Sequence, residues 1–222
     1  MEDFNLHKEV TDKYSLRGRV FNKLREDILA GLYHENEELK EATIGLEFGV
    51  SRTPVREALR QLELEGLVTM IPNKGAYVTG ITSKDIHDIY MIRSYLEGLC
   101  AKLACENITQ AQIEALEEVL YLSDFHARRS HYDQMVELDN KFHEMIYKAS
   151  GSKILNHVLS DFHHYVERVR KITLAEPIRA SKSSQEHAAI LEAIKNRDGA
   201  LAEALAHEHI MSTIKNINDQ GL

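Results

Sequence analysis

Residues 49–60 read Gly-Val-Ser-Arg-Thr-Pro-Val-Arg-Glu-Ala-Leu-Arg, a tight turn followed directly by a helix. Gly49 permits the left-handed backbone of a sharp turn between two helices. Ser51 and Thr53 are residue types that cap helix amides, and proline is tolerated in a first helical turn. The stretch therefore predicts a turn between two helices, the second of which begins near Ser51.

Arginines and apolar residues fall on opposite sides of this helix. Arg52, Arg56 and Arg60 recur every fourth residue and share a face, whereas Val55 and Leu59 can face inward. An apolar inner side with arginine outside is what a DNA recognition helix needs. The alternative is an ordinary amphipathic helix whose arginines are solvated.

The surrounding N-terminal sequence predicts three helices and a two-stranded hairpin. The last helix ends at Gly66, and the β-prone runs 67–71 and 76–79 flank the turn Pro72-Asn73-Lys74-Gly75. This order of elements is a winged helix-turn-helix. Lys74 lies at the hairpin tip, where it is placed to meet a phosphate or the minor groove.

After Gly80 the strand signals end and the sequence reads as helix. Six helices are expected, at 83–106, 110–128, 131–149, 153–173, 178–196 and 199–217. Six helices with short connections form an antiparallel bundle. We therefore expect a mainly α protein, with a winged helix-turn-helix domain at residues 1–80 and an all-helical domain at residues 81–222.

Composition and charge limit the classes of protein to which this chain can belong. The net charge is −8, and residues 1–80 carry 11 lysines and arginines against 14 acidic residues, so any DNA contact must come from a local patch. No apolar run approaches the length of a membrane span, and residues 1–13 read as a polar arm without a signal-peptide core. Cys100 and Cys105 read as buried free thiols, which suits a cytoplasmic protein.

Histidines form a second pattern in the C-terminal half. Asp139 and His143 are four residues apart, so they project from one helix face. His187 and His209 lie about 15–17 Å from the turn between the last two helices, and therefore side by side. One carboxylate and three imidazoles are a set of ligands for Zn²⁺, Ni²⁺ or another divalent transition metal. The alternatives are a surface Asp-His pair and hydrogen-bonded core histidines.

The remaining histidines are not expected to join this set, and one arginine has two interpretations. His207 is two residues from His209, so the two cannot both point inward. Three others read as surface residues: His126, His163 and His164. Locally, Arg93 reads as the partner of Glu97 in an exposed pair four residues apart. Its other reading is an arginine that faces the bundle cavity and clamps a carboxylate.

Several motifs together resemble the GntR family of bacterial transcription regulators, in the FadR-like subgroup with an all-helical FCD domain. The resemblance extends from about residue 15 to 216, and six bundle helices are similar to the shorter, VanR-like branch. It rests on residues 49–59, Leu-Glu-x-Glu-Gly-Leu-Val at 62–68, Pro-Asn-Lys-Gly-Ala-Tyr-Val at 72–78, Arg-x-x-Leu-Glu at 93–97, Asp-x-x-x-His at 139–143 and Glu-His-x-x-Ile-Leu-x-Ala-Ile at 186–194, with the terminal His209.

The resemblance implies roles for individual residues. The DNA-contacting positions of the family fall on Ser51, Arg52, Thr53 and Arg56, with Gly75 in the wing. The family metal site falls on Asp139, His143, His187 and His209. The family position near the effector carboxylate falls on Arg93. The resemblance therefore favours the arginine that faces the cavity over the exposed pair with Glu97. Family members form homodimers, bind palindromic operators and are released from DNA by a small organic acid.

Two departures from the family pattern bear on the operator. Glu35-Asn36 stands where the family usually has Pro-Gly, and Ala42 stands where a basic residue often contacts DNA. The operator preference of relatives therefore does not transfer.

We expect a repressor rather than an enzyme, with no catalytic residues. Its operator binding is expected to respond to a small carboxylate effector at a metal site, with Zn²⁺ or Ni²⁺ favoured over Mn²⁺ and no membrane partner. Two alternatives remain: a metal-dependent enzyme, and a regulator for which the metal itself is the signal.

Overall fold

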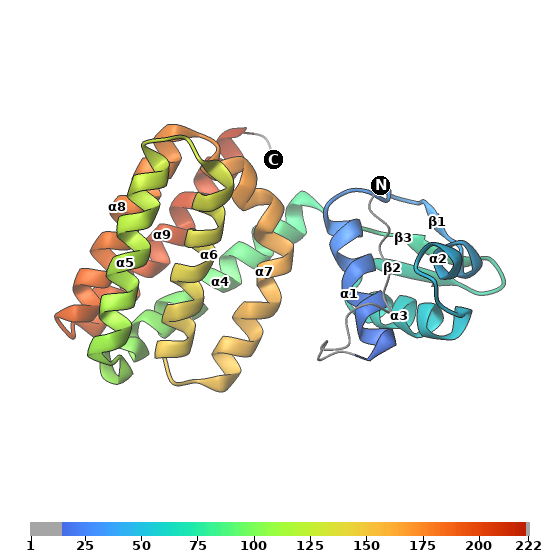
Figure 1. Cartoon of the computed structure of the whole chain (residues 1–222), viewed down its shortest axis with the longest axis horizontal. Coiled ribbons are helices and arrows are strands. Elements are labelled where there is room, and N and C mark those ends of the chain that lie inside the picture. Colours follow the sequence, from blue (N-terminus) through green and yellow to red (C-terminus); the bar gives the residue numbers. More distant parts are fainter. Residues whose placement is uncertain (1–14, 221–222) are drawn as a thin grey trace. The chain divides into compact units, whose positions relative to one another are not determined.

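The computed structural model describes residues 15–220, and the chain divides between Thr82 and Ser83 into two compact units (Figure 1). The N-terminal polar arm expected from the sequence lies outside the described residues. The mainly helical fold class is confirmed. The N-terminal unit contains, in order, α1 (Leu16–Leu29), β1 (Glu38–Leu39), α2 (Glu41–Glu47), α3 (Arg52–Leu64), β2 (Val68–Ile71) and β3 (Gly75–Val78).

Close backbone contact fixes the turn between α2 and α3. Gly49 has a φ of 66°, in the left-handed region that glycine adopts without strain. The amide of Val50 donates to the carbonyl of Gly45 at 2.8 Å, and a Cβ at Gly45 would lie 2.9 Å from the Val50 carbonyl oxygen. A side chain at Gly45 would therefore force the turn and α2 apart.

The capping expectation at Ser51 is wrong in its detail. Ser51 holds the N-cap position of α3, but its side chain accepts no capping hydrogen bond from the helix. Its backbone is extended and its side chain is exposed. The start of α3 is thus set by the glycine turn and by Pro54 in the first helical turn.

The wing is a three-stranded antiparallel sheet, in the order β1-β3-β2, rather than the two-stranded hairpin expected. β1 pairs Glu38 with Tyr77 and Leu39 with Ala76. Its two residues are too few to show strand alternation in the sequence. The strand forms because Leu39 is buried and because the distant β3 offers its free edge.

The recognition helix is held by an apolar core between α1, α3 and the wing. The helix–helix part of this core consists of Val20, Leu24 and Ile28 from α1 with Val55, Ala58, Leu59 and Leu62 from α3. Burying a side chain of this size contributes about 1.5–3 kcal/mol. The inward face expected for α3 is therefore confirmed.

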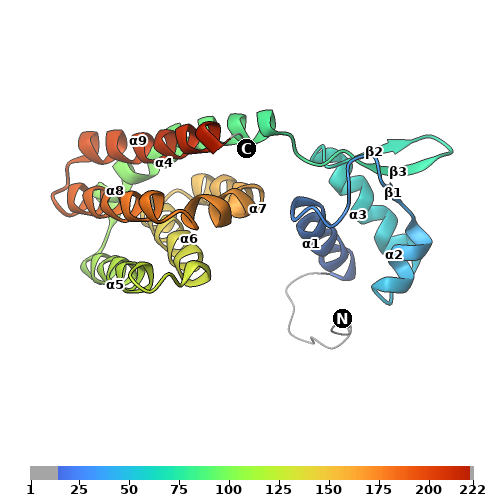
Figure 2. The same cartoon turned by 90° about the horizontal axis from the view of Figure 1, so that it is seen from above.

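The C-terminal unit contains six helices within the described residues: α4 (Ser83–Asn107), α5 (Gln110–Ala127), α6 (Tyr132–Ala149), α7 (Lys153–Leu174), α8 (Pro177–Lys195) and α9 (Gly199–Gln220). α5 begins with a capping box, in which Thr109 and Gln112 exchange hydrogen bonds. Figure 2 shows α9 alongside both α4 and α8. The core joins all six helices, and Cys100 and Cys105 are buried free thiols within it.

Between residues 15 and 220, no helix is both long enough and apolar enough to cross a lipid bilayer.

Candidate metal centre and nucleic-acid interface

The expected DNA-contacting residues of α3 lie on one solvent-facing side of the helix. Ser51, Arg52, Thr53 and Arg56 are all exposed, and Arg60 continues the face by one further turn. Both Arg52 and Arg56 form hydrogen bonds with the Glu41 carboxylate of α2. The sequence did not single out Glu41, because nothing local connects it to residues eleven and fifteen positions away.

The wing presents its expected basic residue at the tip. Lys74 is exposed in the β2–β3 turn, and its amide donates to the Ile71 carbonyl at 3.0 Å. Gly75 has a φ of 112°, which disfavours any other residue there. Asn73 also has a positive φ, so the two residues that flank Lys74 define the turn.

Three histidines converge in the interior of the C-terminal unit. His143 of α6, His187 of α8 and His209 of α9 are buried, and one nitrogen of each lies within 4.8 Å of the others. Nε2 of His187 is 3.2 Å from Nε2 of His209, so the expected side-by-side placement is present. Asp139 joins them, with Oδ1 3.7 Å from Nε2 of His187 and Oδ2 3.8 Å from Nε2 of His143. This is the four-residue set that the sequence pattern predicts.

Two carboxylates orient these imidazoles from outside. Nδ1 of His143 lies 2.7 Å from Oε2 of Glu97, and Nδ1 of His209 lies 2.7 Å from Oε2 of Glu186. An imidazole that donates its Nδ1–H to a carboxylate presents an unprotonated Nε2 on its other side. The donor set therefore fits a divalent transition metal, because His143 and His209 can each present an unprotonated Nε2 to the ion.

Burial and charge favour the protonation states that metal ligands need. Burial lowers the pKa of His187 well below its ordinary value, and His209 adds to the shift. Burial raises the pKa of Asp139, but the Arg170 guanidinium and the three histidines outweigh it, and the net pKa falls. His187 is therefore neutral and Asp139 ionised near neutral pH.

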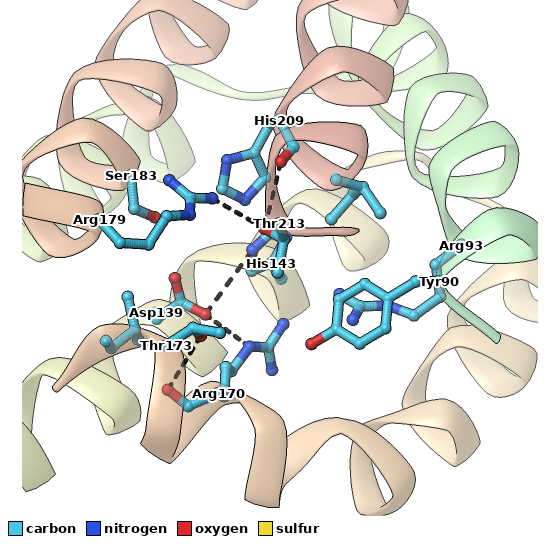
Figure 3. Close-up of a pocket in the computed structure, with 12 residues that line it drawn as sticks. Tyr90, Arg93, Asp139, His143, Arg170, Thr173, Arg179, Ser183, His209 and Thr213 are labelled. Atoms are coloured by element: carbon cyan, nitrogen blue, oxygen red, sulfur yellow. Dashed lines mark hydrogen bonds and ion pairs between the residues drawn. The ribbon is translucent and has the colours of Figure 1, made fainter. Parts of the chain in front are cut away.

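Three arginines line the cavity beside the histidines (Figure 3). Each is buried and paired with a carboxylate: Arg93 Nε to Glu97 at 2.8 Å, Arg170 Nε to Asp139 at 2.6 Å, and Arg179 Nη1 to Glu186 at 2.9 Å. Nη1 of Arg93 is also buried, and no described residue accepts a hydrogen bond from it. The cavity volume is about 20 Å³, which is room for an ion or a water.

Two sequence-based expectations are corrected here. The Arg93–Glu97 pair exists but is buried rather than exposed, because α6 and α7 cover that face of α4. His126, His163 and His164 are half-buried rather than on the surface. Among them, His163 contacts Arg170 of the cavity. Burial and then Arg170 lower the pKa of His163 to about 4.

The sequence did not indicate Arg170 or Arg179 as site residues. A signal for Arg170 was present, because Val166, Arg170 and Thr173 lie at helical spacing and all three are buried. A charged residue on the apolar face of a helix marks a buried ion pair. No comparable signal marks Arg179.

Known protein families match both units. The family described as "Bacterial regulatory proteins, gntR family" matches residues 16–78, and the FCD domain family matches residues 88–212. The chain is 30% identical over 225 residues to the uncharacterized HTH-type transcriptional regulator YdhC of Bacillus subtilis, covering 100% of this chain and 99% of that protein. It is 27% identical over 199 residues to the HTH-type transcriptional repressor RspR of Escherichia coli, covering 90% and 87%. The solved structure of E. coli McbR/YncC has the same fold, with a TM-score of 0.73 at 22% identity over 94% of this chain and 100% of that one.

Proposed function

Because the chain belongs to the GntR family and carries its FCD domain, we propose that it is a repressor controlled by a small organic acid at a metal site in the C-terminal unit. It is a DNA-binding transcriptional regulator and not an enzyme, since both family matches and the curated relatives are of that class. The alternative of a metal-dependent enzyme is therefore set aside. Because its operator lies in bacterial DNA, the proposal also places the protein in the cytoplasm.

The buried cluster of three histidines and one aspartate is the observation that carries the metal part of the proposal. Three imidazole nitrogens and a carboxylate oxygen suit Zn²⁺ or Ni²⁺, and Mn²⁺ less well. A bound ion would supply a Lewis-acidic site for an effector oxygen. Asp139, His143, His187 and His209 would hold it.

Charge balance favours an anionic effector. The three buried arginines of the cavity are matched by Glu97, Asp139 and Glu186, so these six side chains carry no net charge. A divalent ion at the histidines adds two positive charges, which a carboxylate would compensate in part and a dicarboxylate in full. The unsatisfied Nη1 of Arg93 is a ready donor for that carboxylate.

Because the cavity is small, an effector can bind there only if the conformation of the C-terminal unit changes. A space of about 20 Å³ has no room for an organic acid unless side chains of the surrounding helices move. An effector that binds only the rearranged state shifts the population toward it. We propose that this state binds the operator less tightly.

The same small volume favours a second candidate, in which the metal alone is the signal. A metal ion fits the cavity without rearrangement. The two candidates differ in what releases the operator: metal alone, or metal together with an acid.

A DNA shift assay separates these candidates. The probe is the duplex that the wild-type protein selects from a randomised palindromic library. Metal-loaded protein is titrated with acetate, malate, citrate and gluconate, and metal-free protein with Zn²⁺ or Ni²⁺. Release by an acid only when metal is bound is the expected result. Release by metal alone, with no response to any acid, would overturn the organic-acid proposal.

Arg93→Lys tests the role of the arginine in that assay. Lysine keeps the positive charge beside Glu97 but lacks the planar fork that binds a carboxylate through two hydrogen bonds. We expect at least tenfold more acid to be needed for release, with metal content unchanged. An unchanged acid response would remove Arg93 from the effector site.

DNA recognition would follow from a homodimer on a palindromic operator. Two copies of α3 would enter successive major grooves about one helical turn apart. In this proposal Arg52 contacts a guanine edge, and Arg56 and Lys74 bind phosphates. The remaining contacts come from Ser51, Thr53 and Gly75.

An exposed apolar stripe on α4 supports a dimer. Ile92, Tyr95 and Leu99 are 48%, 66% and 37% exposed and recur at helical spacing. Contiguous exposed apolar residues of this kind mark protein–protein interfaces. We propose that the partner subunit covers this stripe.

Tyr95→Glu is expected to convert the dimer to a monomer, because it places a charge in the apolar contact. Light scattering after size exclusion measures the mass. The matched control is Tyr121→Glu on α5, where the tyrosine is 72% exposed. A monomeric wild type, or a dimeric Tyr95→Glu variant, would contradict the proposed interface.

A further inference from the structure

The recognition face contains one acidic residue that binds both of its leading arginines. Oε2 of Glu41 accepts from Arg52 Nε at 3.2 Å and from Arg52 Nη2 at 3.1 Å. The same carboxylate accepts from Arg56, at 2.7 Å from Nε to Oε1 and 2.7 Å from Nη2 to Oε2. Glu41 thus joins the first turn of α2 to two successive turns of α3.

Glu41 is well placed to hold this arrangement. Its side chain is only 18% exposed, whereas those of Arg52 and Arg56 are 66% and 46% exposed. The hydrogen bonds from Arg56 hold the pKa of Glu41 below its ordinary value. A carboxylate in the first turn of a helix is also favoured by the helix dipole. Glu41 is therefore a partly buried anion beneath two more exposed cations.

The geometry of the contacts leaves the DNA-binding side of each arginine available. Glu41 takes the edge formed by Nε and Nη2 in both guanidinium groups. Within residues 15–220, no residue is bonded to Nη1 of either arginine. A guanidinium has five donors, so the second edge can still make a bidentate contact with guanine.

Two physical effects follow for DNA binding. An arginine held by Glu41 loses less rotamer freedom when it docks on a base edge, which favours specific contacts. The negative charge also offsets part of the positive charge of the arginine pair, which weakens attraction to phosphates of any sequence. Both effects raise the ratio of specific to non-specific affinity. They matter more here because Ala42 brings no basic residue from α2.

We propose that Glu41 is a positioning residue for sequence recognition, which orients Arg52 and Arg56 and suppresses their non-specific binding to phosphate. It acts through the two arginines and contacts no base itself. The proposal concerns the DNA-binding activity alone and is independent of the metal and effector.

The test is Glu41→Gln in the full-length protein. The probes are the duplex selected by the wild type from a randomised palindromic library and a scrambled duplex of equal length. We expect the ratio of specific to non-specific affinity to fall about tenfold, on the scale of one bidentate base contact. Binding to the scrambled duplex is expected to strengthen, with a salt dependence steeper by about one released counterion.

Glu57→Gln is the matched control. It removes the same charge from the same unit and frees another exposed arginine of α3, since Glu57 pairs with Arg60 at 3.0 Å. We expect it to keep the wild-type ratio within about twofold. The proposal is overturned if Glu41→Gln also keeps that ratio or raises it, or if Glu57→Gln lowers it equally. Failure of the wild type to select any duplex would instead count against DNA recognition itself.

Discussion

Arg52→Ala is expected to lower sequence selectivity sharply while leaving weak binding to any DNA. A bidentate contact between arginine and guanine is worth about 1–3 kcal/mol of discrimination, which corresponds to roughly 5- to 150-fold. Arg52 occupies the first residue of α3 and is 66% exposed, so its removal leaves the apolar core of the unit intact. Titration of the selected and scrambled duplexes by fluorescence anisotropy measures the two affinities.

Arg60→Ala is the control for Arg52→Ala. Its side chain is 61% exposed on the same helix and pairs with Glu57, but it lies two turns further from the start of α3. We expect it to reduce both affinities slightly and equally. If Arg52→Ala retained the full selectivity of the wild type, Arg52 would not be the base-reading residue.

His187→Ala is expected to remove the metal. The wild type, purified without a histidine tag and reconstituted with Zn²⁺ or Ni²⁺, should hold about one equivalent, and the variant less than a tenth. His187 is buried, and its Nε2 lies against both His209 and Asp139, so its loss opens the centre of the ligand set. Elemental analysis by plasma mass spectrometry gives the stoichiometry.

Thermal stability gives an independent readout of the same site. A ligand that binds only the folded state stabilises it by about 2.7 kcal/mol at a concentration 100 times its Kd. We therefore expect metal to raise the melting temperature of the wild type and to leave that of His187→Ala unchanged.

His207→Ala is the matched histidine control for His187→Ala. His207 lies two residues from His209, on the other side of α9, with its ring 4.9 Å from Tyr95. The control should keep the metal and its stabilising effect. A wild type that binds less than a tenth of an equivalent after reconstitution would contradict the metal site.

The helices of this protein were predictable because their signals are local. Apolar spacing, glycine turns and the Thr109 capping box depend on residues within a few positions of one another. The short strand β1 was not predictable. It exists only because Glu38 and Leu39 pair with Tyr77 and Ala76, almost forty residues further along the chain.

The juxtaposition of His187 and His209 in the cluster was predictable from their spacing in the sequence. His187 and His209 are nearly equidistant from the turn between α8 and α9, and two antiparallel helices bring such residues together. Their outer partners were not predictable in the same way. The contact between Glu186 and His209 depends on how the two helices are rotated about their axes, which sequence spacing alone leaves open.

The sequence by itself determined the two-part architecture and the exposed arginine face of α3. It also indicated that Asp139, His143, His187 and His209 meet in the C-terminal interior. Only the tertiary structure decided the surroundings of the charged groups. Arg93 and Glu97 form the same i,i+4 pair on a solvated or a buried helix face, and packing by α6 and α7 made it buried. Glu41 likewise gained its two arginines from the angle between α2 and α3. Periodicity follows from the geometry of one helix, whereas burial and ion pairing depend on the neighbours that the fold brings to it.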